Sequence, residues 1–323
     1  MASSAAAMCQ NASCRLPADW ILSSPLDFTT GPGSLLAQPG SLLTPGEEKP
    51  SELFVSTSVN RSKKADTADE DGYSVRAVAV QLGGWREMAP DTLLAWSFVY
   101  DDSRQRANDR LARSNSQLYY ADLAVERRWE GWRASGMIGY AHGRHRMRRI
   151  LSHESQTAIG KARTGSHHAM LGAGLSYRFE GTDWYLEPKL GLALLYEHTP
   201  AYREQGLGEH NQNVRRGESF KTIVAPALEF GKHVTLGRNQ LFYWASAGVS
   251  LLPDNTWKAH GHYSGEPDVM LTEVTTLPSV LGDFQAGIVL SRATNWSLHA
   301  QYGLQSGSHY RSHSGILRLS WAF

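Results

Sequence analysis

Apolar side chains recur at every second position over the last fourteen residues of the chain, 310–323. The apolar side carries Gly315, Leu317, Leu319, Trp321 and Phe323. Since successive side chains of a β-strand point to opposite faces, this segment has one apolar face and one mostly small or polar face. The same alternation recurs in about a dozen segments, with no helical periodicity to compete with it. Repeated alternating segments of about ten residues, joined by turns, are typical of membrane-spanning β-barrels, so lipid is an expected partner.

The alternation divides the chain from residue 53 onward into twelve expected strands. These are 53–59, 73–82, 93–100, 117–126, 132–142 or beyond, 168–179, 184–198, 220–230, 241–252, 280–290, 296–305 and 310–323. Short connections follow the even-numbered strands up to the tenth, and long ones follow the odd-numbered strands up to the ninth, as in outer-membrane barrels with short periplasmic turns and long external loops. The sequence therefore predicts an all-β fold, a twelve-stranded antiparallel transmembrane β-barrel over residues 52–323.

A soluble β-sandwich is the alternative fold, because its strands also alternate between an apolar and a polar face. Aromatic residues distinguish the two. Trp184 and Tyr196 lie at the two ends of one apolar stripe, and Trp132 and Tyr140 at the ends of another. Aromatic residues gather at both interfaces of a membrane-spanning barrel, so their positions favour the barrel.

Composition excludes two other classes of protein. No stretch approaches the roughly 20 apolar residues of a membrane-spanning helix, which excludes a helical membrane protein. The chain has 32 basic and 31 acidic residues, so it lacks the charge excess of a nucleic-acid-binding protein. Its mean hydropathy is negative. A barrel is compatible with that value, since half of every strand is polar.

Residues 1–51 are rich in proline, glycine and serine, and we interpret them as a tail or linker, or as the remnant of a preceding domain. Pro32, Pro39, Pro45 and Pro50 leave no room for a helix longer than a turn or two, so an extended conformation is expected. The start lacks the basic and apolar regions of a secretory signal. An exported chain needs such a signal, so we expect a fragment, a processed piece or a misassigned start.

Both cysteines of the chain, Cys9 and Cys14, lie in this tail. They could form a small disulfide loop or remain two unpaired thiols, and their spacing fits no strong metal or redox motif. No cofactor or metal site is expected.

Several segments together resemble the translocator domain, or β-domain, of the autotransporters of Gram-negative bacteria (type V secretion). They are Gly139-Tyr140, the stretch 172–179 that ends in Tyr177-Arg178-Phe179, the Trp184-Tyr185-Leu186-Glu187-Pro188 segment, and the alternating carboxyl terminus 314–323. No single segment is specific, but their order and spacing are. The resemblance covers roughly residues 53–323.

The resemblance implies an outer-membrane barrel that assists export of an amino-terminal passenger domain to the cell surface, without enzymatic activity. It also implies insertion by the outer-membrane barrel assembly machinery, which recognises the last strand. The expected assembly signal is therefore Gly315, Leu317, Leu319, Trp321 and Phe323. A helical linker inside the pore is a further implication, and the prolines of residues 32–50 argue against it. The sequence shows no passenger, and no counterpart of the asparagine pair at which some members cleave themselves.

Charged residues of both signs are expected to face the lumen. They are Asp122, Glu126, Arg133, Arg178, Glu187, Lys189, Lys221, Glu229, Asp283 and Arg318. In a barrel of about twelve strands such groups can pair across a hydrated lumen. They either hold the shape of the barrel or provide a wet lining for a passing polypeptide, and both roles are compatible.

A basic cluster follows the fifth expected strand. It contains Arg144, Arg146, Arg148 and Arg149. At this height guanidinium groups could contact the phosphates of lipopolysaccharide. The alternative is an ordinary solvated loop.

Two rival functions remain at the level of sequence. One is a passive channel or adhesin. The other is a surface hydrolase that uses rim residues, for which Asp101, Asp102, His153, His167 and His168 are the candidates. Adjacent aspartates after a strand are more often turn formers, so no catalytic residue is assigned.

Overall fold

The computed structural model describes residues 51–323 except 69, 154–155, 238 and 293–294. The expected linker and the two cysteines, Cys9 and Cys14, lie outside the described residues.

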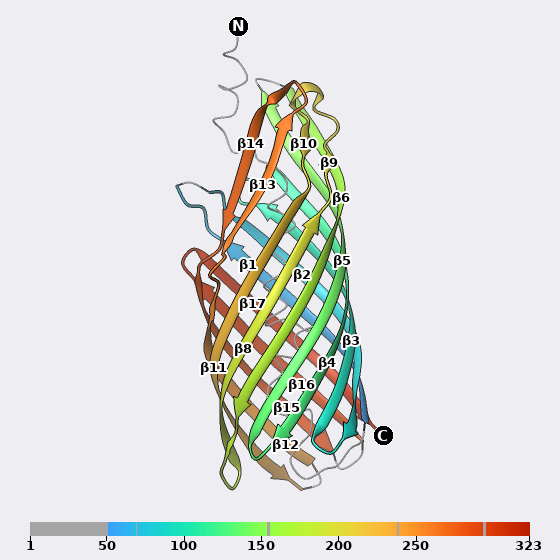
Figure 1. Cartoon of the computed structure of the whole chain (residues 1–323), viewed down its shortest axis with the longest axis vertical. Coiled ribbons are helices and arrows are strands. Elements are labelled where there is room, and N and C mark those ends of the chain that lie inside the picture. The colour runs from blue at the N-terminus through green and yellow to red at the C-terminus, as the bar shows by residue number, and fades with distance from the viewer. Residues whose placement is uncertain (1–50, 69, 154–155, 238, 293–294) are drawn as a thin grey trace.

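Twelve long strands form the body of the molecule (Figure 1). They are β1 (Ser51–Lys64), β2 (Tyr73–Ala89), β3 (Thr92–Ala107), β4 (Ala112–Trp129), β5 (Trp132–His153), β6 (Gln156–Tyr177), β8 (Trp184–Thr199), β11 (Gly217–Leu236), β12 (Asn239–Leu251), β15 (Val280–Arg292), β16 (Trp296–Gly307) and β17 (Tyr310–Ala322). Each pairs antiparallel with the next, and β1 pairs with β17. This closes the ring and confirms the predicted twelve-stranded barrel.

Burial alternates along each strand, as the sequence pattern requires. On β8 the side chains of Tyr185 and Glu187 are almost fully buried, whereas Leu190 and Leu192 are 51% and 41% exposed. Large apolar side chains cannot remain exposed to water over such an area without cost. The outward face of the barrel is therefore a lipid-facing surface, and the inward face is a polar lumen.

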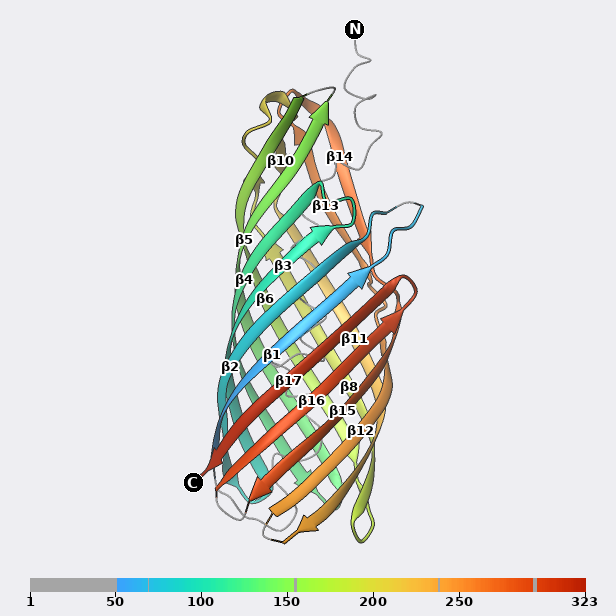
Figure 2. The ribbon, with the colours of Figure 1, turned by 180° about the vertical axis from the view of Figure 1, so that it is seen from behind.

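Aromatic residues bound the apolar belt of the outward face, whose strands are seen from behind in Figure 2. On β5, Trp132 marks one boundary and Tyr140 the other, both strongly exposed. They are about 27 Å apart along the strand, which at a tilt of about 40° is about 20 Å along the barrel axis. On neighbouring strands the rings of Tyr100 and Tyr119 pack against one another at the upper boundary, with centroids 5.3 Å apart. The height of the belt is close to that of the apolar band of outer-membrane barrels, about 25 Å.

The strands extend well beyond their predicted ends on the long-loop side. The segment 143–167, expected as an external loop, forms the upper halves of β5 and β6, which pair without interruption from Trp132 to His153. At the short-turn end, the segment 83–91, expected as a turn, is mostly strand as well. On the long-loop side, polar outward side chains suggest loops, because they lie outside the lipid. The backbone pairing nevertheless continues above the membrane.

A small second sheet lies above the barrel rim. It contains β9 (Tyr202–Arg203), β10 (Gln212–Val214), β13 (Thr256–Tyr263) and β14 (Glu266–Thr276), with the 3₁₀ turn η3 (Gly208–His210) between β9 and β10. A two-residue strand, β7 (Phe179–Glu180), pairs with β8 at the opposite end. An apolar cluster joins the small sheet to the upper halves of β5 and β6; its members are Met147, Ala162, Tyr202, Val214 and Ala259. The small sheet therefore belongs to the external part of the barrel.

Within the described residues no helix is long and apolar enough to cross a membrane.

Candidate functional site

An ion-pair network lines the lower half of the lumen, with Glu187 on β8 at its centre. The Glu187 carboxylate accepts hydrogen bonds from Arg178 Nε at 2.8 Å, from Ser176 Oγ at 2.7 Å and from Arg133 Nη1 at 3.3 Å. The Arg133 guanidinium also lies 3.3 Å from the carboxylate of Glu126. These strands bring together predicted lumenal residues that are up to 61 positions apart, from Glu126 to Glu187. The network joins β4, β5, β6 and β8 into one wall.

The same network continues onto β11 through Glu229. Lys189 Nζ donates to Glu229 Oε2 at 2.7 Å, and Tyr185 Oη donates to Glu229 Oε1 at 2.6 Å. The Arg178 guanidinium stacks 3.9 Å from the centre of the Tyr185 ring. Glu229 is only 1% exposed. Opposite charges are thus paired at close range, which limits the desolvation cost of burying them.

The predicted lumenal aspartates have hydroxyl partners rather than cations. Ser97 Oγ donates to Asp122, and Ser250 Oγ donates to Asp283. In both pairs the serine lies on the strand next to the aspartate in the barrel. These contacts are local links between neighbouring strands.

The two remaining predicted cations pack on aromatic rings. Lys221 Nζ lies 4.6 Å from the ring centre of Trp257 and donates to the backbone carbonyl of Thr256. The Arg318 guanidinium lies 4.2 Å from the ring centre of Phe54. Both are nearly fully buried. All ten predicted residues are buried or half-buried and alternate with lipid-facing residues; their part in export stays a prediction.

A ladder of serines and histidines in the upper lumen was not predicted. His145 Nδ1 is hydrogen-bonded to Ser116 at 2.8 Å and its Nε2 to Ser166 at 2.8 Å, and Ser166 is also 2.8 Å from His168 Nε2. Ser166 is fully buried. The sequence pattern could have revealed them, since these residues continue the inward alternation of β4, β5 and β6 above the expected strand ends.

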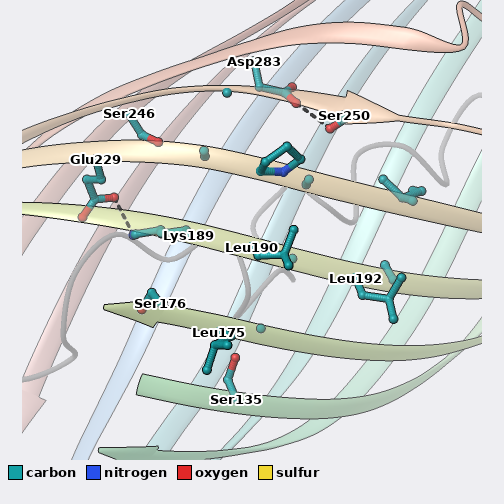
Figure 3. Close-up of a pocket in the computed structure, with 18 of the residues that line it drawn as sticks. Ser135, Leu175, Ser176, Lys189, Leu190, Leu192, Glu229, Ser246, Ser250 and Asp283 are labelled. Carbon is teal, nitrogen blue, oxygen red and sulfur yellow. Dashed lines mark hydrogen bonds and ion pairs between the residues drawn. The ribbon is translucent and has the colours of Figure 1, made fainter. Parts of the chain in front are cut away.

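Small side chains line the wall between β5 and β15, where the lumen holds a cavity of about 140 Å³. Figure 3 shows Ser135, Ser176, Ser246 and Ser250 along this wall, with the Lys189–Glu229 and Ser250–Asp283 contacts drawn as dashed lines. Glycine and alanine fill further inward positions; they include Gly174, Gly191, Ala225, Ala227 and Gly248. Because these side chains are short and uncharged, this part of the wall offers room and hydroxyl groups.

The basic cluster predicted to contact lipopolysaccharide divides between the two faces of β5. Arg144, Arg146 and Arg148 point outward, and the first two are exposed. Arg149 differs from the prediction. Its side chain is 3% exposed and pairs with Glu204, with Nη2 to Oε2 at 2.6 Å and Nε to Oε1 at 3.2 Å. Adjacent residues on a strand cannot share a face, so Arg148 and Arg149 cannot belong to one surface.

The buried Arg149–Glu204 pair joins the small external sheet to the barrel. Glu204→Gln removes the carboxylate from a buried guanidinium, a change that costs about 3 kcal/mol in buried pairs. We expect trypsin to cleave the folded variant after the exposed Arg203 at least fivefold faster than the wild type. Glu218→Gln, in a carboxylate that is 54% exposed, is the matched control and leaves the cleavage rate unchanged. Equal rates for Glu204→Gln and wild type would contradict this role.

The candidate hydrolase residues divide between the two faces of the barrel wall. Asp101 and Asp102 are consecutive on β3, so their side chains point to opposite faces, as do those of His167 and His168 on β6. His167 Nδ1 is hydrogen-bonded to Tyr140 Oη at 2.7 Å on the outward side. The side chain of His153 lies outside the described part of the structure. Among the described residues no group of three or more His, Cys, Asp or Glu side chains is placed to hold a metal.

The last strand lies at the seam where the barrel closes. Phe323 N donates to the carbonyl of Ser51 at 3.1 Å, and Ser51 Oγ donates to the carbonyl of Phe323 at 2.9 Å. Leu317, Trp321 and Phe323 are 48%, 47% and 66% exposed. Both ends of the barrel sequence therefore meet at the short-turn end, and the last strand presents an apolar outward edge there.

Comparison with known proteins agrees with this architecture. Residues 53–303 match the family model described as the autotransporter β-domain. The translocator domain of the autotransporter NalP from Neisseria meningitidis is similar in structure, with 14% sequence identity, coverage of 86% of this chain and 90% of that one, and a TM-score of 0.67. The transport unit of AIDA-I from Escherichia coli is 14% identical, with coverage of 87% and 93% and a TM-score of 0.57.

The β-domain of the Bordetella autotransporter BrkA is 14% identical and covered completely, against 85% of this chain, with a TM-score of 0.59. No curated protein matches the sequence. The structural likenesses at this identity establish the fold, and the family model spans most of the chain. The chain belongs to the autotransporter β-domain family.

Proposed function

We propose that this barrel exports a polypeptide segment joined to its amino-terminal end by guiding it through the lumen described above. The barrel is an outer-membrane translocator domain of a Gram-negative bacterium, as the family and the fold show. The observation that supports passage through the lumen is the position of Ser51. Its contacts with Phe323 place the start of β1 at the short-turn end, which in outer-membrane barrels is periplasmic. A segment preceding β1 therefore reaches the cell surface by crossing the membrane beside or within the barrel.

The lumen has the chemistry that such passage requires. Glu187 is paired with Arg178 and Glu229 with Lys189, while Asp122 and Asp283 accept hydrogen bonds from serines. The wall that lines the cavity carries short hydroxyl, glycine and alanine side chains. Paired charges and short side chains give a moving chain few strong attachment points, so the wall suits transit of sequences of many kinds.

Insertion by the barrel assembly machinery is the second part of the proposal. The outward face of β17, with Leu317, Trp321 and Phe323, is the surface that this machinery would read. It is apolar and lies at the closing seam with β1. We assign no catalytic role to the barrel, because Asp101 and Asp102 divide between the two faces of β3 and His167 and His168 between the two faces of β6.

A reporter experiment tests the lumenal route. An epitope-tagged reporter placed before Leu53 should become accessible to protease on intact cells. Ala225→Trp narrows the lumen at a half-buried wall position, and we expect it to lower surface display of the reporter at least tenfold while the barrel still migrates as a folded, heat-modifiable species.

The matched control is Leu228→Trp, which places the same bulk on the lipid-facing side of the same strand, away from the cavity. We expect its display to stay within twofold of the wild type. Equal display by the two variants would refute the lumenal route, whether both are high or both are low.

A further inference from the structure

Cationic side chains cover the outward face of strands β1–β6 just above the apolar belt. We call this surface the cationic face. Its lower register runs across neighbouring strands through directly opposed pairs, with Arg61 opposite Arg76, Arg76 opposite Arg104, and Arg146 opposite Arg163. All of these side chains are exposed. The register crosses the strands without an intervening acid, since β4 contributes Asn115 between Arg104 and Arg146.

An upper register repeats the arrangement two residues further from the membrane. Arg106 lies opposite Arg113, Arg113 opposite Arg148, and Arg148 opposite Lys161. Like charges directly opposite one another destabilise a sheet. In the described part of the chain none of these cations is within ion-pair distance of a carboxylate. The protein thus holds a costly arrangement that a bound anion would relieve.

The cationic face contains two hollows. Arg113, Arg146, Lys161 and Arg163 line a surface hollow of about 740 Å³. A second hollow of about 470 Å³ lies below it and is lined by Arg104 and Arg144 together with Asp102. Several guanidinium groups therefore converge on each hollow, and guanidinium forks are the side chains best suited to phosphate oxygens.

The height of the cationic face identifies the kind of anion. The Arg144 guanidinium lies 6.0 Å from the ring centre of Tyr119, so the cationic face begins directly at the aromatic boundary. Along β5, Arg144 is about 10 Å and Arg148 about 20 Å above Tyr140 at a tilt of about 40°. A glycerophospholipid presents its phosphate in one plane at the boundary. Because the strands are tilted, each register rises from β1 toward β6, so the cationic face presents cations at both heights. A glycolipid with phosphates on both its anchoring and its outer sugars would meet both sets of cations.

We propose that the cationic face is a binding site for the phosphorylated glycolipid of the outer leaflet, lipopolysaccharide. The cations nearest the apolar belt contact the phosphates of the acylated sugars; they are Arg61, Arg76, Arg104 and Arg144. The cations further out on β3–β6 contact phosphates of the outer sugars. The site is independent of export, because it lies on the lipid side of the barrel wall. The proposed site includes Arg144, Arg146 and Arg148 of the four arginines predicted from the sequence, and it extends over six strands.

Binding of a fluorescent bisphosphorylated lipid A to the purified full chain, folded in nonionic detergent, tests the proposal. We expect saturable binding to the wild type, and binding at least tenfold weaker for lipid A without phosphates. The variant R61Q/R76Q/R104Q/R144Q should bind bisphosphorylated lipid A at least tenfold more weakly. The matched control R86Q/R127Q removes two exposed arginines at the opposite end of β2 and β4 and should stay within twofold of the wild type.

Three outcomes would overturn the proposal. They are equal binding of lipid A with and without phosphates, an affinity of the quadruple variant within twofold of the wild type, and competition by phosphatidylglycerol as effective as that by lipid A. The last result would assign the cationic face to phospholipid or to general anion attraction. If the quadruple variant fails to fold, the comparison of the three lipids on the wild type decides alone.

Discussion

Deletion of Phe323 should lower the amount of folded, heat-modifiable barrel in the outer membrane at least tenfold. Phe323 is the most exposed of the outward aromatic residues on the last strand, and its backbone contacts Ser51 at the closing seam. Removing it shortens the apolar edge that the assembly machinery is proposed to read, and it removes two hydrogen bonds that join the two ends of the barrel. The measurement is the folded fraction on gels of unheated membranes.

Two substitutions separate the loss of the aromatic ring from the loss of the backbone hydrogen bonds. Phe323→Tyr keeps an aromatic ring and both backbone contacts, so we expect a folded yield within twofold of the wild type. Phe323→Ala keeps the backbone contacts and loses the ring, so it should resemble the deletion if recognition dominates. Wild-type yield from the deletion would remove the last residue from the assembly signal.

The second large effect concerns Glu187. Glu187→Gln removes the carboxylate that pairs with Arg133 and Arg178. The Glu187 side chain is 1% exposed in the folded barrel. Breaking a buried ion pair by removing one partner costs about 3 kcal/mol or more. We expect a loss of about 3 kcal/mol in the free energy of unfolding, measured by urea titration of the barrel in lipid vesicles with tryptophan fluorescence.

The matched control is Glu218→Gln. Glu218 is 54% exposed and lies 3.6 Å from His198, and such exposed pairs contribute about 0–1 kcal/mol. A double variant, E187Q/R178Q, should recover part of the loss because it removes one unpaired cation. If Glu187→Gln and Glu218→Gln destabilise the barrel equally, the lumenal network does not hold the wall together.

The strand pattern and its two faces could be predicted from sequence, because a period of two over each strand determines which side chain meets lipid. The alternation of Tyr185 and Glu187 with Leu190 and Leu192 is visible without a structure. The strand ends above the membrane could not be predicted in the same way. Arg144 and Arg146 indicated a loop, since charged outward residues are compatible both with a loop and with a strand that has left the lipid.

Contacts between distant segments could not be predicted from the sequence either. The pairing of Arg149 with Glu204 depends on how the small external sheet packs on β5 and β6, which no local pattern reveals. The serine–histidine ladder was missed for a related reason. Its members alternate correctly, but Ser116, His145 and Ser166 lay outside the expected strands. The cationic face likewise emerges only once the register of six strands is known.

The exported segment is proposed to pass along the inward wall of the barrel. The most direct test places a photo-crosslinking residue at Ser246, on the cavity wall, or at the lipid-facing Ala247 next to it, while a folded reporter before Leu53 stalls export. We expect a covalent adduct between barrel and stalled segment from Ser246 and none from Ala247. An adduct from Ala247 alone, or from neither position, would contradict passage along the inward wall.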